Sequence, residues 1–154
     1  MTLHSSRYAA RIHQPRARLW DRWLTTVITA VAAYGAVLVV HGGAAAMLFD
    51  RLGFGPTASG ITAGAVEDHV LLIYGVLGAV LIGWMVLLLA VARGPLRRRE
   101  RWAWTATAVS MTAWFGVDTA FSLAVGSTAH AAFNGIFAAA LGIPLIAMRR
   151  HLTA

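Results

Sequence analysis

The chain has 154 residues, the length of one domain, and 58% of them are hydrophobic while only 12% are charged. A soluble domain of this size needs more charge to cover its surface, so this composition, with a mean hydropathy of +0.67, predicts a bilayer-embedded protein. Cysteine is absent, which excludes disulfides, thiolate metal sites and a cysteine nucleophile.

Residues 1–23 form a basic N-terminal segment, in which arginines recur at roughly helical spacing. Trp20 and Trp23 come near its end, where interfacial tryptophans anchor a chain at the lipid headgroups. Two interpretations stay open for this segment. It is either a cytoplasmic segment lying on anionic headgroups or a disordered tail.

Four apolar runs follow, and the first covers residues 24–48. At 1.5 Å per residue it is long enough to cross a hydrocarbon core of about 30 Å. Ala44-Ala45-Ala46 resembles a signal-peptidase site, but the run is longer than the usual core of a signal peptide. The domain over 24–148 is therefore predicted to contain helices over 24–48, 67–92, 102–125 and 129–148, with loops at 49–66 and 93–101, a turn at 126–128 and a cytoplasmic tail at 149–154.

Each of the last three runs carries small residues at intervals of four. This spacing lets a neighbouring helix approach closely, so these stripes are predicted to be helix contact faces. Their members are Gly75, Ala79 and Gly83, then Thr112, Gly116 and Ala120, then Ala131, Gly135 and Ala139.

The arginines predict the membrane orientation. Five of the thirteen lie in residues 1–23, five in 93–101 and two in 149–154, which leaves Arg51 as the exception, and the chain has no lysine. Because cytoplasmic loops carry the excess of basic residues, the predicted fold is an all-α integral membrane bundle of four transmembrane helices with both termini cytoplasmic. The arginines flank apolar runs, so nucleic acid is not predicted as a partner.

This topology gathers polar residues from all four helices in the outer half of the bilayer. Asp118 lies roughly 10 Å below the outer surface. A charged aspartate near the membrane centre costs about 2.5–3.5 kcal/mol, so such a residue is normally paired, protonated or facing a cavity. One interpretation is a pocket open to the outside, and the other is a polar network that joins the helices. The candidate ligand-binding residues are His41, Tyr74, Asp118, Ser122, His130 and Asn134.

A metal or haem site would be a narrower form of the pocket. His41, His69 and His130, with Asp118, could supply three imidazoles and a carboxylate. None of them has the His-x-x-x-His or Glu-x-x-His spacing that places two ligands on one helical face, so no metal site is predicted and no cofactor is assigned. Serine-nucleophile motifs and phosphate-binding loops are absent from the sequence as well.

The predicted second and third helices and the loop between them contain several distinctive short strings: Gly83-Trp84, Gly94-Pro95-Leu96-Arg97-Arg98, Trp102-Ala103-Trp104, Trp114-Phe115, Asp118-Thr119 and Ser122. They resemble strings of small bacterial four-helix membrane proteins of the BphX-like and DoxX-like families. The resemblance covers about residues 24–150 and implies the four-helix architecture, but no catalytic residue.

The sequence therefore predicts a multi-pass protein of the bacterial inner membrane. Besides the lipid bilayer, its expected partners are a small apolar or amphipathic ligand or other membrane subunits. The leading hypothesis is a non-enzymatic binding or accessory protein. A membrane enzyme is an alternative, acting on a lipid or quinone-like substrate with Asp118 as acid or base and His41 or His130 beside it. A structural subunit that uses the small-residue stripes is the other.

Overall fold

The computed structural model describes residues 3–54, 65–150 and 152, and in these ranges it contains five α-helices and no strand. The prediction of an all-α protein is confirmed. In chain order the helices are α1 (Leu3–Val40), α2 (Gly42–Phe54), α3 (Ala65–Arg93), α4 (Arg101–Ala124) and α5 (Thr128–Arg149).

Three segments are long and apolar enough to cross a membrane: Arg18–Val40, Glu67–Arg93 and Thr128–Arg149. Their outer faces carry many exposed large hydrophobic side chains, as expected of helices that face lipid. α4 has 24 residues but is less apolar, because it contains Asp118 and several threonines. The prediction of a membrane protein is thus supported by three spans rather than four.

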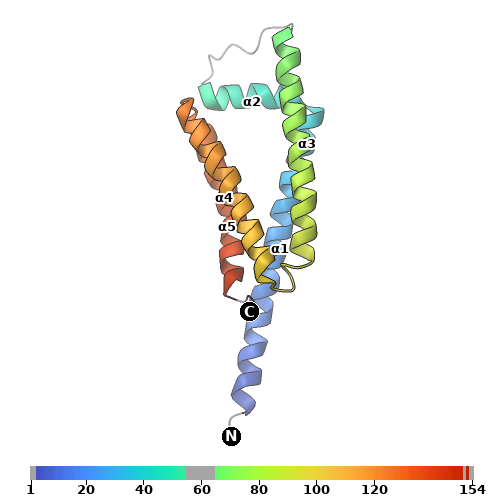
Figure 1. The fold of residues 1–154 in the computed structure, drawn as a ribbon, viewed down its shortest axis with the longest axis vertical. Coiled ribbons are helices and arrows are strands. Elements are labelled where there is room, and N and C mark those ends of the chain that lie inside the picture. The colour runs from blue at the N-terminus through green and yellow to red at the C-terminus, as the bar shows by residue number, and fades with distance from the viewer. Residues whose placement is uncertain (1–2, 55–64, 151, 153–154) are drawn as a thin grey trace.

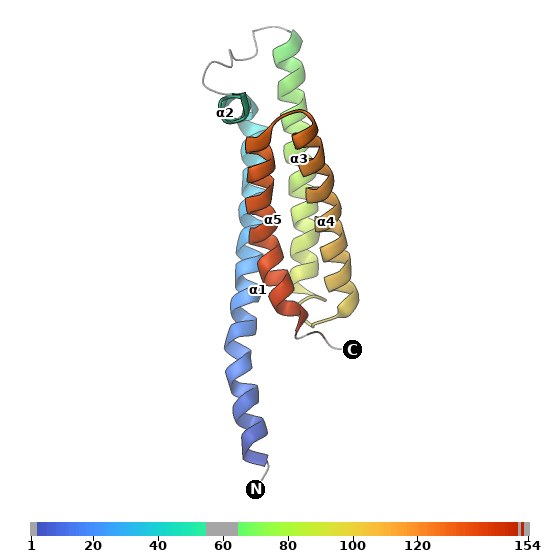
Figure 2. The same cartoon turned by 90° about the vertical axis from the view of Figure 1, so that its left-hand side faces the viewer.

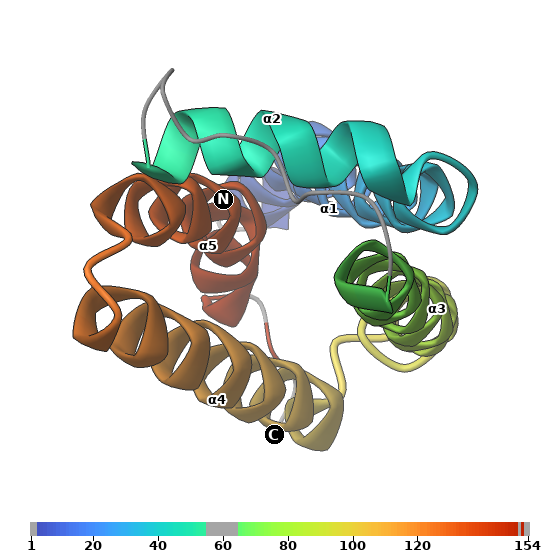
Figure 3. The same cartoon turned by 90° about the horizontal axis from the view of Figure 1, so that it is seen from above.

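The predicted helix over 24–48 is wrong, because the structure divides this run at His41. α1 begins far earlier, at Leu3, and ends at Val40, whereas α2 begins at Gly42. Figure 1 shows α2 running across the end of the bundle, and Figure 3 shows it lying over the ends of α1 and α5. At the start of α2 the backbone of Gly42 lies against α3, since a Cβ added there would be in ordinary contact with Cβ of Tyr74 at 3.4 Å.

The other helices agree with prediction to within two residues at each end. Of the predicted loop over 49–66, residues 49–54 belong to α2 and 65–66 to α3, and the rest lies outside the described residues. The N-terminal segment is helical from Leu3 and extends beyond the other helices (Figure 2).

The helices pack as two pairs, α1 against α3 and α4 against α5, and α1 also contacts α5. Most of the fully buried hydrophobic side chains lie in the half nearest the loop between α3 and α4. The α4/α5 pair leans away from α3 toward the end that α2 crosses (Figure 1). In the half nearest the loop between α3 and α4, the buried core side chains are Leu24, Ile28, Met85, Leu88, Leu96, Ala103, Met111, Leu141, Leu145 and Met148.

The closest approach of α1 and α3 occurs at Gly35 and Gly78, which are both buried. A Cβ at Gly35 would lie 2.9 Å from the carbonyl oxygen of Gly78, and a Cβ at Gly78 would overlap that of Gly35. The predicted stripes do not make such contacts: Gly83, Gly116 and Gly135 are exposed, with nothing within 4 Å of an added Cβ. The predicted contact faces therefore do not lie between helices of this chain, because these glycines point outward.

The loop between α3 and α4 is fixed to α1 by an ion pair. Arg99 Nη2 donates to Asp21 Oδ2 at 3.1 Å, and both side chains are largely buried. Arg99 has φ +64°, a left-handed conformation that costs a non-glycine residue roughly 1–2 kcal/mol and persists where other contacts enforce it. At the end of the loop, hydrogen bonds from Arg98 and Trp102 hold the pKa of the Glu100 carboxyl below its usual value.

A proline in α5 creates a contact between α1 and α5. Pro144 has no backbone N–H, so the carbonyl of Ala140, four residues earlier, has no intrahelical donor at that position. The indole Nε1 of Trp23 donates to this carbonyl at 3.1 Å. A hydrogen bond to the neighbouring helix thus replaces the one that proline removes.

We expect Trp23→Phe to lower the free energy of unfolding by about 1 kcal/mol, because it removes this donor. In a Pro144→Ala background the backbone N–H that the substitution restores can serve the Ala140 carbonyl, so the loss of the indole should cost less. Denaturant unfolding of the four proteins in one detergent, followed by circular dichroism, measures the difference. Equal costs in both backgrounds would contradict the role given to the proline.

Candidate functional site

A tight turn places the polar residues of α4 and α5 side by side. The turn occupies residues 125–127, one residue earlier than predicted. The Gly126 N–H donates to the carbonyl of Leu123 at 3.1 Å and the Ser127 N–H to that of Ser122 at 2.8 Å. With Gly126 at φ +81°, this is a Schellman motif, which ends α4 abruptly and reverses the chain.

Across this hairpin Asp118 of α4 meets His130 of α5. His130 Nε2 lies 3.5 Å from Asp118 Oδ1, which forms an ion pair when the imidazole is protonated. The Asp118 side chain is 30% exposed and the His130 side chain 36% exposed, so the pair lies at the edge of the interior. Ser122 donates to the backbone carbonyl of Asp118 at 2.7 Å and lies 3.5 Å from Oδ1, so its hydroxyl mainly serves its own helix.

Asn134 lies one turn after His130 on the same face of α5, about as far from the turn as Asp118. Only 6% of the residue is exposed, and its buried Nδ2 has no hydrogen-bond partner among the described residues. An unsatisfied buried donor costs about 1–3 kcal/mol. This amide is therefore suited to an acceptor atom from another molecule.

The interior of the α4/α5 hairpin changes character along its length. Near the loop between α3 and α4, residues 94–100, which we call the arginine loop, the buried residues of the hairpin are mostly apolar, for example Met111, Leu141 and Leu145. Toward the turn they are Ser122, Ser127 and Asn134. In this half of the hairpin the described buried residues are all polar, whereas packing alone favours apolar ones.

Aromatic rings connect this cluster to α1 and α3. The ring of Phe133 lies 6.4 Å from that of His130 and 6.3 Å from that of Tyr34 in α1. Tyr34 and Tyr74 of α3 are both half-buried and pack against the same hydrophobic core. Tyr34 was not among the residues predicted from the sequence, although it is the single tyrosine of the first apolar run.

Two of the candidate histidines lie elsewhere. His41 is exposed at the junction of α1 and α2, and His69 is exposed in the first turns of α3. Within the described ranges no three His, Asp or Glu side chains lie close enough to share a metal ion. The structure therefore does not bring His41, His69 and His130 together. Of these three histidines, His130 is the one that lies beside Asp118.

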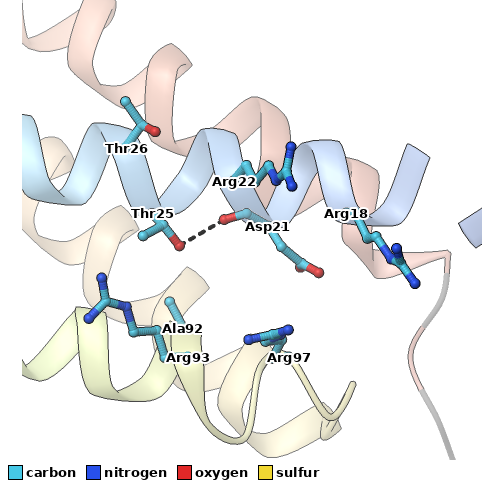
Figure 4. A pocket seen from close by; sticks show the side chains of 8 residues that line it. All are labelled: Arg18, Asp21, Arg22, Thr25, Thr26, Ala92, Arg93 and Arg97. Carbon is cyan, nitrogen blue, oxygen red and sulfur yellow. Dashed lines mark hydrogen bonds between the residues drawn. The ribbon is translucent and has the colours of Figure 1, made fainter. Parts of the chain in front are cut away.

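A second polar feature lies at the opposite end of the molecule. A cavity of about 680 Å³ opens there between α1 and the C-terminal end of α3. Sequence reasoning missed it, because the arginines that line it were used only to predict orientation. Its lining residues, drawn in Figure 4, are Arg18, Asp21, Arg22, Thr25, Thr26, Ala92, Arg93 and Arg97.

Comparisons of the chain with protein-family models, curated proteins and solved structures found no match. The resemblance to the BphX-like and DoxX-like families stays a prediction.

Proposed function

We propose that this chain is a non-enzymatic binding or accessory protein of the bacterial inner membrane, which binds a small amphipathic ligand at the outer ends of α4 and α5. The polar group of the ligand accepts a hydrogen bond from Asn134 and lies near the Asp118–His130 pair. Its apolar body packs beside the aromatic rings of Tyr34 and Phe133.

The observation that carries this proposal is the unpartnered, buried Nδ2 of Asn134, one helical turn from the Asp118–His130 contact. A network that served only to join helices would satisfy its buried donors, because a half-satisfied polar network is worse than an apolar core. The change from apolar to polar buried residues along the hairpin supports the same conclusion.

We also propose that α4 crosses the membrane together with the three apolar spans, with both termini in the cytoplasm. α4 lies beside α5 and has nearly its length (Figure 2). The arginine loop, the cavity arginines of α1 and the end of α5 lie at one end of the helices (Figure 1). The cytoplasmic side of membrane proteins carries this excess of positive charge.

A structural subunit is the second candidate. The small-residue stripes on α3, α4 and α5 face away from this chain, and small residues let helices of other subunits approach closely.

Ligand retention tests the first candidate. We expect gently extracted parent protein to carry a small molecule in native mass spectrometry, and Asn134→Leu or Asp118→Asn to retain at least tenfold less of it, because each removes a polar contact. Ala132→Leu, on the exposed face of α5, is the matched control and should retain it fully.

Equal retention in Asn134→Leu and the control would contradict the binding site. Protein that carries no small molecule but co-purifies with another subunit would favour the structural candidate. Conversion of the bound molecule by the parent, but not by Asp118→Asn, would instead show an enzyme.

A further inference from the structure

The cavity at the arginine-rich end carries a concentrated positive charge. Arg18 and Arg22 reach it from α1, and Arg93 and Arg97 from the end of α3 and the loop that follows (Figure 4). Asp21 is the one carboxylate among the lining residues. Its charge is offset by Arg99, which lies outside the lining and donates to Asp21 Oδ2 at 3.1 Å.

The four lining guanidinium groups have no carboxylate partner in the part of the chain that the structure describes. The ion pairs there involve Arg98, Arg99 and His130 instead. Four cations around one cavity repel one another, and an anion bound among them removes that repulsion. Guanidinium groups also match phosphate oxygens in geometry, since each can donate two parallel hydrogen bonds.

The level of the cavity in the membrane identifies the source of the anion. Arg18 is the first residue of one apolar span and Arg93 the last residue of another, so the cavity lies where the hydrocarbon ends. Trp20 and Trp23, with ring centroids 5.7 Å apart, follow Arg18 on α1 and are of the type that sits at headgroup depth. Lipid phosphate groups occupy this layer, and basic pockets between helices bind them.

We propose that this cavity binds the phosphate of an anionic phospholipid headgroup. Its volume falls within the range of small-molecule sites, about 300–1,000 Å³, so the cavity can hold a headgroup. The site is separate from the polar cluster at the other end of the helices, and it does not depend on what that cluster binds.

The test is binding of phosphatidylglycerol to delipidated full-length protein in a neutral detergent, measured by native mass spectrometry, with phosphatidylcholine as the zwitterionic comparison. The double variant Arg93→Gln/Arg97→Gln should bind phosphatidylglycerol about 25-fold more weakly, since each basic residue near an anionic surface contributes a factor of about five. Arg18→Gln/Arg22→Gln removes the other two guanidinium groups and should act similarly, should the first variant not fold.

The matched control is Arg101→Gln/Arg150→Gln. Both arginines are exposed at the same end but do not line the cavity, so the control loses the same charge and should bind within twofold of the parent. An equal loss in the control, or equal binding of the two lipids by the parent, would overturn the proposal. Displacement of the lipid by millimolar inorganic phosphate would overturn the lipid as the source and assign the site to a soluble phosphate.

Discussion

Gly78→Ala is expected to separate α1 from α3 and to lower the free energy of unfolding by about 3 kcal/mol. The added methyl group would overlap the backbone carbonyl oxygen of Gly35 and press on Val39 and Leu38. Overpacking of a close contact typically costs 1–3 kcal/mol, and backbone atoms cannot rotate away as the end of a side chain can. Denaturant unfolding in one detergent, followed by circular dichroism, measures this loss.

Gly83→Ala is the control on the same helix. Nothing lies within 4 Å of a Cβ at Gly83, and alanine favours helix over glycine by up to about 1 kcal/mol. This variant should be as stable as the parent or slightly more stable. If Gly83→Ala proved the more damaging of the two, the α1–α3 contact would have to lie on the stripe that the sequence predicts.

The second large effect concerns the pair at the outer end. His130→Leu should cost about 1–3 kcal/mol, because Asp118 then stays in the outer half of the hairpin without the imidazole that lies 3.5 Å from its carboxyl group. Adding Asp118→Leu should recover most of this loss, since the carboxylate and its insertion cost both disappear. A double-mutant cycle in the same unfolding assay gives the coupling energy.

Independent costs that simply add in the double variant would show that the two residues do not stabilise each other. The cycle measures stability alone, so its outcome and that of the ligand-retention experiment are separate. A strong coupling with unchanged ligand retention would describe a pair that only joins α4 to α5.

Helix positions were largely predictable from the sequence, because apolar runs bounded by arginines leave few alternatives. The end of α1 was not predictable, because His41, Gly42 and Gly43 lie inside a continuous apolar run. Hydropathy shows that such a run is apolar but not where the chain changes direction. The helix contact at Gly35 and Gly78 was missed for a related reason. Its two glycines belong to different helices, and a search for repeats within one helix cannot find them.

The candidate site was predictable in part. Asp118, Ser122 and His130 come together because a turn of three residues joins α4 to α5, and helical spacing puts Asn134 on the face of His130. His41 could not be placed correctly without the break at the end of α1. The cavity at the other end was not predictable, because its arginines come from α1 and from the end of α3 with the loop that follows, and only the folded chain brings them together.

The crosswise position of α2 has a mechanical consequence in the proposed orientation. The 23 residues of Arg18–Val40 measure roughly 35 Å along the helix, against a hydrocarbon thickness of about 30 Å. Because the chain turns at His41 into α2, the span ends at Val40, and at its other end the guanidinium groups of Arg18 and Arg22 resist entry into the lipid tails. In the proposed orientation we therefore expect α1 to tilt in a membrane thinner than its apolar span and to stand more upright in a thicker one.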